Sequence, residues 1–446
     1  MKEKFDDLSY PDAPRIVVKP PGPKAKEILK KEEKYIAKGA FSVTKDSPLL
    51  PVVLESGRGS TVKDVDGNIF IDFSAGWHVT NAGHCHPKIT KVVKEQLDKI
   101  WNTDSFAHEI RYLAAKKLAE IAPKGLNKSY FVSSGSDAGE NAVKIARNFT
   151  KKHDIIAFHH NFHGRTYLTG SLTGAAGMGK DMGPYASRIL HAPDPYCYRC
   201  VFKQKYPECG LACLDYVKQV IKCESPNDVA AVVTEPFNGL CTMPDGYLPG
   251  LKEICEENDI LFVAEEVATG MGRTGKMFAV EHWNVVPDIL CLDKGMGNGV
   301  PASAVIARDD IIDEMPAGSA ITTYGMNPLT CAATIATIDV MLEEKIPENA
   351  AVVGDHMLKR LRETSDDYKL IGDVRGKGLR LIIELVKDQK TKEPALEETQ
   401  KIYYSVYEKG LLPLYPAVHW TPPLVLTKKL ADKGIDIFEE SLKEIM

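Results

Sequence analysis

The chain has 446 residues, of which 44% are hydrophobic and 26% are charged, and its formal net charge is −5. This composition is ordinary for a globular enzyme, and the length is sufficient for two domains. The acidic balance and the lack of a long basic run argue against nucleic-acid binding. No apolar stretch approaches the roughly 20 residues that cross a bilayer, and the first residues hold no apolar signal core. We therefore expect a cytoplasmic protein that has no membrane segment.

The first 50 residues are rich in proline and lysine and predict one helix, Ala25–Gly39, within an arm. From about residue 125, short aliphatic runs alternate with amphipathic segments. This alternation is typical of βαβ units and a mostly parallel sheet. The expected strands are Ser129–Ser134, Ile155–His160, Ala230–Glu235, Ile260–Glu266, Ile289–Lys294 and Ala302–Arg308, and the expected helices are Asp137–Lys152, Leu211–Lys222 and Tyr247–Asn258.

The pattern changes after a long expected helix, Asn327–Glu344. Two further helices, Glu348–Ser365 and Glu397–Lys409, are expected around a strand at Leu379–Val386, and a last helix starts at Thr427. Helices that follow the alternating region in this way predict a second, smaller α+β unit.

Lys294 ends the aliphatic run 289–294 and is followed by a glycine-rich stretch, 295–299. The run predicts a buried strand. A lysine at the end of such a strand loses hydration, which disfavours its charged form. A neutral lysine amine can form a Schiff base with a carbonyl. Lys294 is therefore a candidate nucleophile, although a lysine can also simply mark the place where a strand meets water.

Small and aromatic residues follow two other expected strands. Gly135 and Ser136 leave one strand and open a helix, where exposed N–H groups and the helix dipole favour a phosphate. Phe162 follows the next strand and can stack on a planar ring. Arg165, three residues later, can hold a carboxylate through two hydrogen bonds.

Carboxylates follow two more strands, at Glu235 and at Glu265 with Glu266. Buried carboxylates usually have a partner, since burying them alone costs several kcal/mol. Ligands of parallel α/β sheets bind at the carboxyl ends of the strands. A phosphate site, an aromatic ring, acids and a lysine suit pyridoxal 5′-phosphate (PLP), which has a phosphate, a flat ring, a ring nitrogen and an aldehyde.

The segment 270–277 matches two phosphate-binding patterns, GxGxxG and the start of GxxxxGK. The second pattern fails at Met277, where a magnesium site needs a Ser or Thr hydroxyl. The first pattern would make the protein a nicotinamide-dependent dehydrogenase, which we keep as a remote alternative. Against it, Glu265 and Glu266 precede the glycines and would repel a pyrophosphate. A tight glycine turn accounts for the segment more simply.

Ten cysteines are present, and four of them cluster as two close pairs, Cys197 with Cys200 and Cys209 with Cys213. Zinc binding, disulfides and free thiols all remain open for these four. The second pair has helical i, i+4 spacing and fits known zinc sites only in part. We interpret the cluster as a feature that stabilises an inserted segment and takes no part in the chemistry. We expect no metal in the active site.

These motifs together resemble a class III (ω-amino acid) aminotransferase of fold type I, similar to 4-aminobutyrate aminotransferases. The resemblance covers about Gly57 to Leu426. Its motifs are Asp64–Asn68, Ile71–Phe73, Gly83–Pro87, Ser134–Ala138, Phe162–Thr166, Glu235–Pro236, Glu266–Gly275, Lys294–Gly295, Thr323–Pro328, Arg375–Leu379 and Pro422–Leu424. It implies an α/β fold with an N-terminal arm and part of a small domain in 1–75, a large PLP-binding domain in 76–330 and a small α+β C-terminal domain in 331–446.

The resemblance also implies roles for individual residues. Lys294 would hold the cofactor and later carry the substrate's α-proton. Gly135 and Ser136 would bind the phosphate, and Phe162 and Val267 would pack on the two faces of the ring. The resemblance also explains the glycine-rich segment 270–277 as a loop that is typical of this family.

Further roles concern the substrate and a second subunit. Thr323 would reach the phosphate of the neighbouring subunit's cofactor, which implies at least a homodimer and leaves a tetramer open. Glu235 would line the substrate pocket, and Arg165 would hold a distal carboxylate.

Three positions depart from the family's pattern. Glu265 stands where the family has the aspartate that pairs with the ring nitrogen, so the charge is kept on a side chain one methylene longer. Ala268 stands where a glutamine is common. His419 stands where an arginine usually clamps the substrate α-carboxylate, and an imidazole is a weaker and pH-dependent partner. Either this departure disfavours the common dicarboxylate acceptors, or Arg165 or His419 binds the carboxylate instead.

We therefore expect a PLP-dependent aminotransferase that moves an amino group from an ω-amino acid or amine to a 2-oxo acid. The alternative is an amino-acid racemase or epimerase on the same scaffold, because fold does not determine reaction. A racemase needs Lys294 and a second proton carrier on opposite faces of one carbanion.

Overall fold

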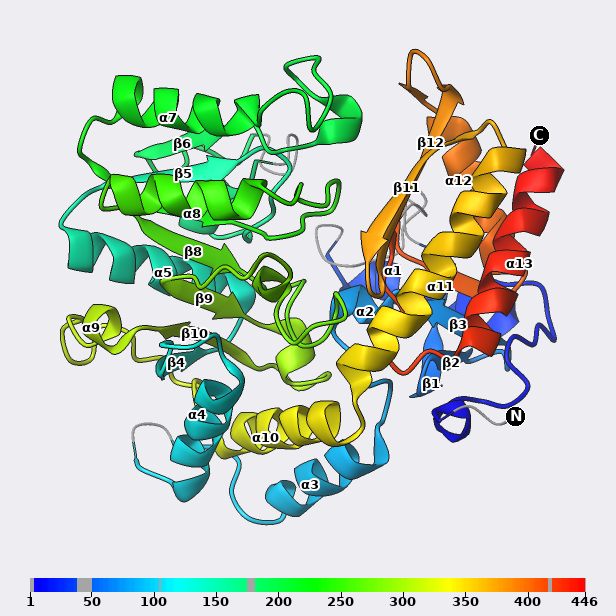
Figure 1. Ribbon diagram of the computed structural model, residues 1–446. Helices are drawn as coiled ribbons and strands as arrows, with labels where there is room; N and C mark the ends of the chain where they lie inside the picture. Colours follow the sequence, from blue (N-terminus) through cyan, green and yellow to red (C-terminus); the bar gives the residue numbers. More distant parts are fainter. Residues whose placement is uncertain (1–3, 38–49, 104–105, 175–180, 416–418, 446) are drawn as a thin grey trace. The chain divides into compact units, whose positions relative to one another are not determined.

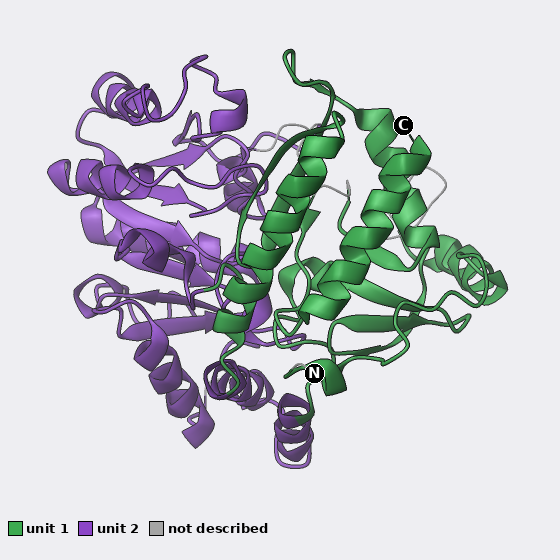
Figure 2. Cartoon of the chain, turned by 45° about the vertical axis from the view of Figure 1, so that its right-hand side comes forward, with its two compact units in different colours: residues 1–87, 273–275, 344–446 green, residues 88–272, 276–343 purple. Residues whose placement is uncertain are grey.

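The computed structural model describes residues 4–37, 50–103, 106–174, 181–415 and 419–445. The chain forms two compact units, which Figure 2 colours separately. Unit 1 combines Met1–Pro87, Arg273–Gly275 and Glu344–Met446, and unit 2 combines Lys88–Gly272 and Lys276–Glu343. Unit 1 thus draws on both ends of the chain.

Unit 2 is built on a seven-stranded sheet in the order β4-β10-β9-β8-β7-β5-β6 (Figure 1). The strands from β9 to β6 are parallel, whereas β10 runs antiparallel to both of its neighbours. The mostly parallel α/β sheet that we expected is confirmed. The bounds are β4 (Lys128–Val132), β5 (Asp154–Phe158), β6 (Ile189–Ala192), β7 (Val229–Thr234), β8 (Leu261–Glu265), β9 (Ile289–Leu292) and β10 (Ser303–Ala307).

All six expected strands are present, but β6 was not predicted. It has four residues, lies at the edge of the sheet and is only partly buried. A short edge strand buries too little apolar surface to leave a clear pattern in the sequence.

Alternate residues of the buried strands enter two separate cores. In β8, Phe262 and Ala264 belong to one core and Leu261 and Val263 to the other, as the two-residue period of a strand requires. The first core also contains apolar residues of α7 (Ala212–Glu224) and α8 (Tyr247–Glu257), and the second contains those of α5 (Gly135–Thr150). Helices thus cover both faces of the sheet.

Several further helices complete unit 2. Of these, α4 and α10 pack against each other. Their bounds are α3 (Pro87–Leu97), α4 (Glu109–Ile121), α6 (Tyr167–Leu172), α9 (Asp309–Ile312) and α10 (Pro328–Glu343).

Unit 1 holds two smaller sheets. In the first, ordered β1-β2-β3-β14, strand β14 runs parallel to β3 although more than 300 residues separate them. In the second, β12 pairs with β11, β13 and β15. The bounds are β1 (Leu54–Arg58), β2 (Thr61–Asp64), β3 (Ile69–Phe73), β11 (Ile371–Lys377), β12 (Arg380–Asp388), β13 (Glu393–Pro394), β14 (Leu411–Pro413) and β15 (His419–Trp420).

The helices of unit 1 are α1 (Pro23–Tyr35), α2 (Ala75–His78), α11 (Ile346–Asp367), α12 (Leu396–Glu408) and α13 (Lys428–Ile445), and α13 packs against both α11 and α12. Helix α1 ends before the expected Gly39, which lies outside the described residues. Of the strands, only the one at Leu379–Val386 had been predicted.

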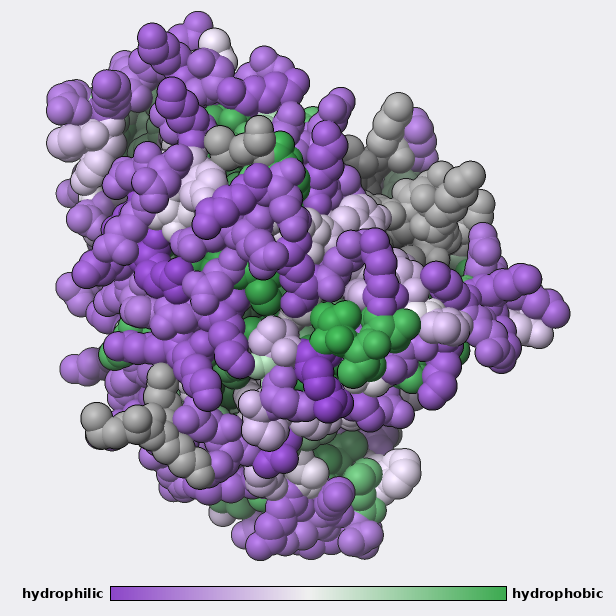
Figure 3. Space-filling view, turned by 90° about the vertical axis from the view of Figure 1, so that its right-hand side faces the viewer, coloured by the Kyte–Doolittle hydropathy of each residue, from purple (hydrophilic) through white to green (hydrophobic). Residues whose placement is uncertain are grey.

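In the described part of the chain, no helix is long and apolar enough to cross a membrane. The face of the molecule in Figure 3 is mostly hydrophilic, with small hydrophobic areas.

Candidate active site

The N-terminus of helix α5 has the features of an anion-binding site. Its N-cap is Ser134, whose hydroxyl accepts a hydrogen bond from the backbone N–H of Asp137 at 3.2 Å. The backbone N–H of Gly135 donates to Oδ2 of Asp293 at 2.9 Å. A carboxylate therefore stands where backbone donors and the helix dipole favour negative charge. A helix start of this kind also suits a phosphate, which would compete with Asp293 for the Gly135 N–H.

Two glycines let separate segments meet at this helix start. A Cβ on Gly135 would lie 3.1 Å from Oδ2 of Asp293 and from both methyl groups of Val267. Gly164 has a φ of +137°, and a Cβ there would lie 2.3 Å from the hydroxyl of Ser136. Larger residues would push the strand ends apart.

Lys294 stands beside the same helix start. It lies two residues after the end of β9, is half-buried and has a φ of +47°. A non-glycine residue in this left-handed region costs about 1 kcal/mol or more, and such strain is concentrated at functional sites. Burial raises the pKa of the adjacent Asp293 carboxyl, against the opposing effects of the backbone N–H groups of Lys294 and Gly135 and of the Lys294 charge. The lysine and an acid are thus neighbours in a partly desolvated stretch of the chain.

Glu265, at the end of β8, is 4% exposed. Its Oε1 accepts a hydrogen bond from the backbone N–H of Val267 at 2.7 Å, and its Oε2 lies 3.4 Å from Nδ1 of His163. Both ring nitrogens of His163 are buried without a hydrogen-bond partner among the described residues. The carboxylate is therefore held by a backbone amide, and the imidazole of His163 lies beside it without a hydrogen bond.

The neighbouring Glu266 has different surroundings. It accepts hydrogen bonds from the backbone N–H groups of Ala279 and Val280 at 2.7 and 2.9 Å and from the hydroxyl of Thr269 at 2.9 Å. Burial raises the pKa of Glu266 to about 7. Glu266 therefore holds the glycine-rich loop together, and only Glu265 of the expected acidic pair is near the other candidate residues.

Phe162 and Glu235 are joined across two strand ends. The backbone N–H of Phe162 donates to Oε2 of Glu235 at 2.9 Å, and the backbone N–H of Glu235 donates to Oδ1 of Asn161 at 2.8 Å. The guanidinium of Arg165 lies 5.8 Å from the centre of the Phe162 ring, which is within the range of a cation–π contact. Arg165 itself is exposed, and its backbone N–H donates to the hydroxyl of Ser136 at 3.3 Å.

Thr323 lies in the segment between β10 and α10 and is exposed. The hydroxyl of its neighbour Thr322 lies 3.4 Å from that of Ser133, one residue before the cap of α5. The segment therefore touches the region just before the phosphate-type site, while the Thr323 side chain faces outward.

His419 belongs to unit 1, where it pairs with Ile382 of β12. Burial, together with the charges of Arg380 and Arg375, lowers the pKa of His419 to about 4. The imidazole is therefore neutral at physiological pH and cannot replace an arginine as a cation. Of the three residues predicted to bind substrate, only Arg165 carries a positive charge.

The structure thus brings Gly135, Val267 and the Asp293–Lys294 pair together in unit 2. Two polar neighbours, Asp293 and His163, were not predicted from the sequence. Asp293 could have been noticed, since it is a carboxylate directly before the candidate lysine at the end of a buried strand. His163 carries no comparable signal.

Comparisons with known proteins place this geometry in a family. Residues 42–442 match the model of the class-III aminotransferases. An alanine/serine racemase of Pyrococcus horikoshii is 38% identical, over 97% of this chain and 93% of its own. A 5-aminovalerate aminotransferase of Pseudomonas aeruginosa is 35% identical, over 94% and 98% of the two chains. The crystal structure of an (S)-enantioselective ω-transaminase from Thermomicrobium roseum superposes with a TM-score of 0.89, at 28% identity, over 95% and 99% of the two chains.

The chain therefore belongs to the class-III aminotransferase family. It is a PLP-dependent enzyme of the transaminase type, as the resemblance in its sequence predicted. The anion-accepting start of α5, the close approach at Gly135 and the half-buried lysine fit this cofactor.

Proposed function

We propose that the enzyme transfers an amino group from an ω-amino acid or amine to a 2-oxo acid. The observation that carries the proposal is the grouping in one unit of a half-buried lysine, an anion-accepting helix start and a held carboxylate. The relatives include enzymes named for 5-aminovalerate and for 4-aminobutyrate.

Several residues would hold the cofactor. Gly135 and Ser136 would bind its phosphate at the start of α5, and Phe162 and Val267 would enclose its ring. When bound, PLP supplies an aldehyde for the amine and a ring that delocalises the electron pair left when a C–H bond breaks.

Two residues would handle protons. The Nζ atom of Lys294 would accept the proton from the substrate carbon that bears the amino group and would donate it to the cofactor carbon that carried the aldehyde. Glu265 would keep a proton on the ring nitrogen, because its negative charge favours the protonated ring and the backbone N–H of Val267 holds the carboxylate in place. The longer side chain of Glu265 keeps the charge that the family's aspartate provides.

Substrate selection would depend on Arg165 and Glu235. Arg165 is exposed and can pair with the distal carboxylate of an ω-amino acid. Glu235 is 4% exposed and its Oε2 already accepts a hydrogen bond, so it would repel a second carboxylate and favour a neutral or amine-bearing group. We still propose that His419 binds substrate. Because its imidazole is neutral, it would act as a hydrogen-bonding group and not as a cation.

We also propose that the enzyme is at least a homodimer. Thr323 would then bind the phosphate of the cofactor in the neighbouring subunit, in keeping with its outward-facing position.

A racemase or epimerase is the second candidate. A specific observation favours it, since the relatives that are 38% and 36% identical are named as an alanine/serine racemase and as a leucine/methionine racemase of Thermococcus litoralis. A racemase would use Lys294 on one face of the substrate carbon and another proton carrier on the opposite face.

A single experiment separates the two candidates. The purified enzyme, loaded with PLP, is incubated with one enantiomer of an amino acid in the absence of any oxo acid, and both enantiomers are followed by chiral chromatography. A transaminase converts at most about one substrate molecule per site, because its amino group remains on the cofactor. Sustained loss of optical purity over many turnovers would contradict the transfer reaction. The same enzyme is then screened with ω-amino acids and amines against pyruvate and 2-oxoglutarate.

A further inference from the structure

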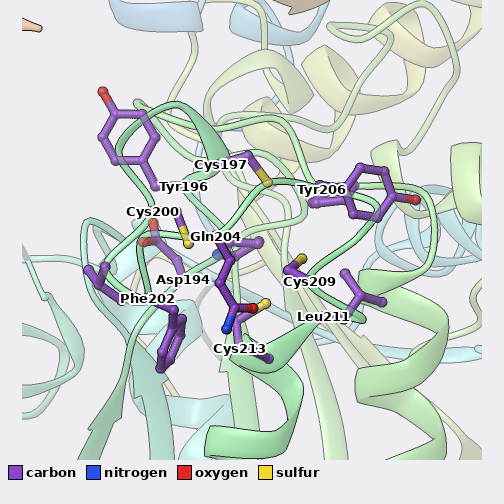
Figure 4. Close-up of a pocket in the computed structure, with 14 residues that line it drawn as sticks. Asp194, Tyr196, Cys197, Cys200, Phe202, Gln204, Tyr206, Cys209, Leu211 and Cys213 are labelled. Atoms are coloured by element: carbon purple, nitrogen blue, oxygen red, sulfur yellow. The ribbon is translucent and has the colours of Figure 1, made fainter. Parts of the chain in front are cut away.

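The segment from the end of β6 to the first turn of α7 carries four cysteines that have no part in the proposed catalysis. We call Cys197, Cys200, Cys209 and Cys213 the thiol cluster. They line one cavity, and in Figure 4 their sulfur atoms surround the same space from different sides. Every cysteine in the described part of the chain is a free thiol, including these four. Four convergent thiols in a single short segment are therefore available to one ligand.

Local backbone structure places the thiols in two pairs. Cys197 opens a short 3-10 turn, Cys197–Arg199, and Cys200 follows it directly. Cys213 is the second residue of α7, while Cys209 precedes the helix by three residues. The chain turns sharply between them, with a φ of +55° at Gly210 and +62° at Leu211. One pair on a tight turn and one pair at a helix start can thus face the same centre.

The size and lining of the cavity limit what it can hold. Its volume is about 20 Å³, which is room for roughly one water-sized body. Phe202, Tyr206 and Leu211 add apolar surface, and among the described residues no lysine, arginine or histidine lines it. A small single ion fits this space, whereas an organic anion or a cluster of several metal atoms does not.

The side-chain chemistry of the cluster suits a divalent cation. A thiol that coordinates such an ion loses its proton and binds the ion as a thiolate.

We propose that the thiol cluster binds one Zn²⁺ ion as a closed structural site. Four S–H groups would release their protons to solvent, and each sulfur would form one Zn–S bond of the tetrahedral set that thiolates give zinc. In the structure, no three ligand side chains of the described residues stand close enough together to hold a metal. The ion would therefore draw the thiols inward, as expected where metal binding and local folding are coupled.

Direct metal analysis tests this proposal. Purified enzyme is expected to contain close to one zinc per chain, and a chelator that removes the zinc should expose additional thiols to a thiol reagent. Apo-enzyme should regain the zinc from a buffered zinc solution. Zinc below about one tenth per chain, with no uptake, overturns the proposal, and so do thiols that react only after a reductant, which would indicate disulfides.

Substitutions locate the ion. Cys197→Ser or Cys213→Ser should reduce the bound zinc at least tenfold. Cys223→Ser is the matched control, because Cys223 lies on the same helix α7 but is exposed and outside the cavity. Equal zinc in all three variants, or equal loss in all three, overturns the assignment. If a cluster variant does not fold, the zinc content and the thiol count of the unmodified enzyme still decide.

Discussion

Two regions of unit 2 are built on opposite plans. At the carboxyl edge of the sheet, hydrogen bonds already hold the candidate carboxylates. The backbone N–H of Gly135 donates to Asp293, and that of Val267 donates to Glu265. In the thiol cluster, the side chains line a cavity as separate free thiols. A catalytic site gains rate from groups that are positioned before the substrate arrives. A structural metal site can instead obtain its order from the ion.

The largest effect on activity should come from Lys294, at the carboxyl edge of the sheet. Lys294→Ala removes the amine that holds the cofactor and carries the proton, so kcat should fall at least about 10³-fold. The purified variant should also lose the yellow colour of the bound cofactor. Spectra and initial rates measure both effects. Lys276→Ala is the control, since Lys276 is exposed and donates only to the backbone oxygen of Glu281. Unchanged colour in Lys294→Ala would contradict the assignment.

The second effect concerns stability and comes from Glu266. Its folded-state pKa of about 7 lies above the ordinary value of 4.5. The folded protein therefore binds an extra proton between these values, and the stability that this proton provides is full below pH 4.5 and is lost as pH rises through 7. The loss amounts to at most about 3.5 kcal/mol, at roughly 1.4 kcal/mol per pH unit.

Glu266→Gln should remove this pH dependence while it keeps an oxygen for the loop's N–H groups. Denaturant or thermal unfolding from about pH 5 to 8 should show a smaller decline for the variant than for the unmodified enzyme. Parallel curves for the two proteins would show that Glu266 does not titrate in this range.

The third prediction concerns Glu265, where two variants test separately whether activity depends on the charge or on the length of the side chain. Glu265→Gln keeps the size and removes the charge, so kcat should fall about 10²-fold, as when a group that stabilises the transition state is lost. Glu265→Asp keeps the charge and should retain most of the activity, since the role requires an acid near the ring nitrogen. Half-reaction kinetics with saturating cofactor measure both variants. Equal losses in the two would mean that position matters more than charge.

The smallest effect should appear at Arg165. Arg165→Met should raise the KM for an ω-amino acid about 10-fold, because a hydrogen bond to a charged group contributes about 1.5 kcal/mol or more. An amine of the same length without the carboxylate should be unaffected and serves as the control substrate. If KM rises equally for both substrates, Arg165 acts on the site as a whole and not on the carboxylate.

Adjacent residues at the end of β8 show where sequence reasoning reached its limit. The family resemblance assigned the ring nitrogen to Glu265, but Glu265 and Glu266 are the same residue type one position apart, and no local pattern predicts which groups each carboxylate contacts. Successive side chains leave a strand in opposite directions. Glu265 therefore lies beside His163, whereas Glu266 accepts hydrogen bonds from the backbone at the start of the 3-10 helix Ala279–Trp283. Only the folded chain shows which partner each one finds.

The sequence by itself determined the parallel α/β core, because buried strands leave apolar runs whose ends mark the ligand edge of the sheet. It also indicated the PLP-type residues, including Lys294, from the residue types found just after the expected strands. The tertiary structure decided the features that depend on distant segments. Strand β14 joins β3 across most of the chain, Asp293 reaches the start of α5, and His419 is neutral because of burial and two nearby arginines. Such strand pairings and pKa values depend on residues that are far apart in the sequence and become neighbours only in the folded chain. Local sequence patterns do not encode these contacts.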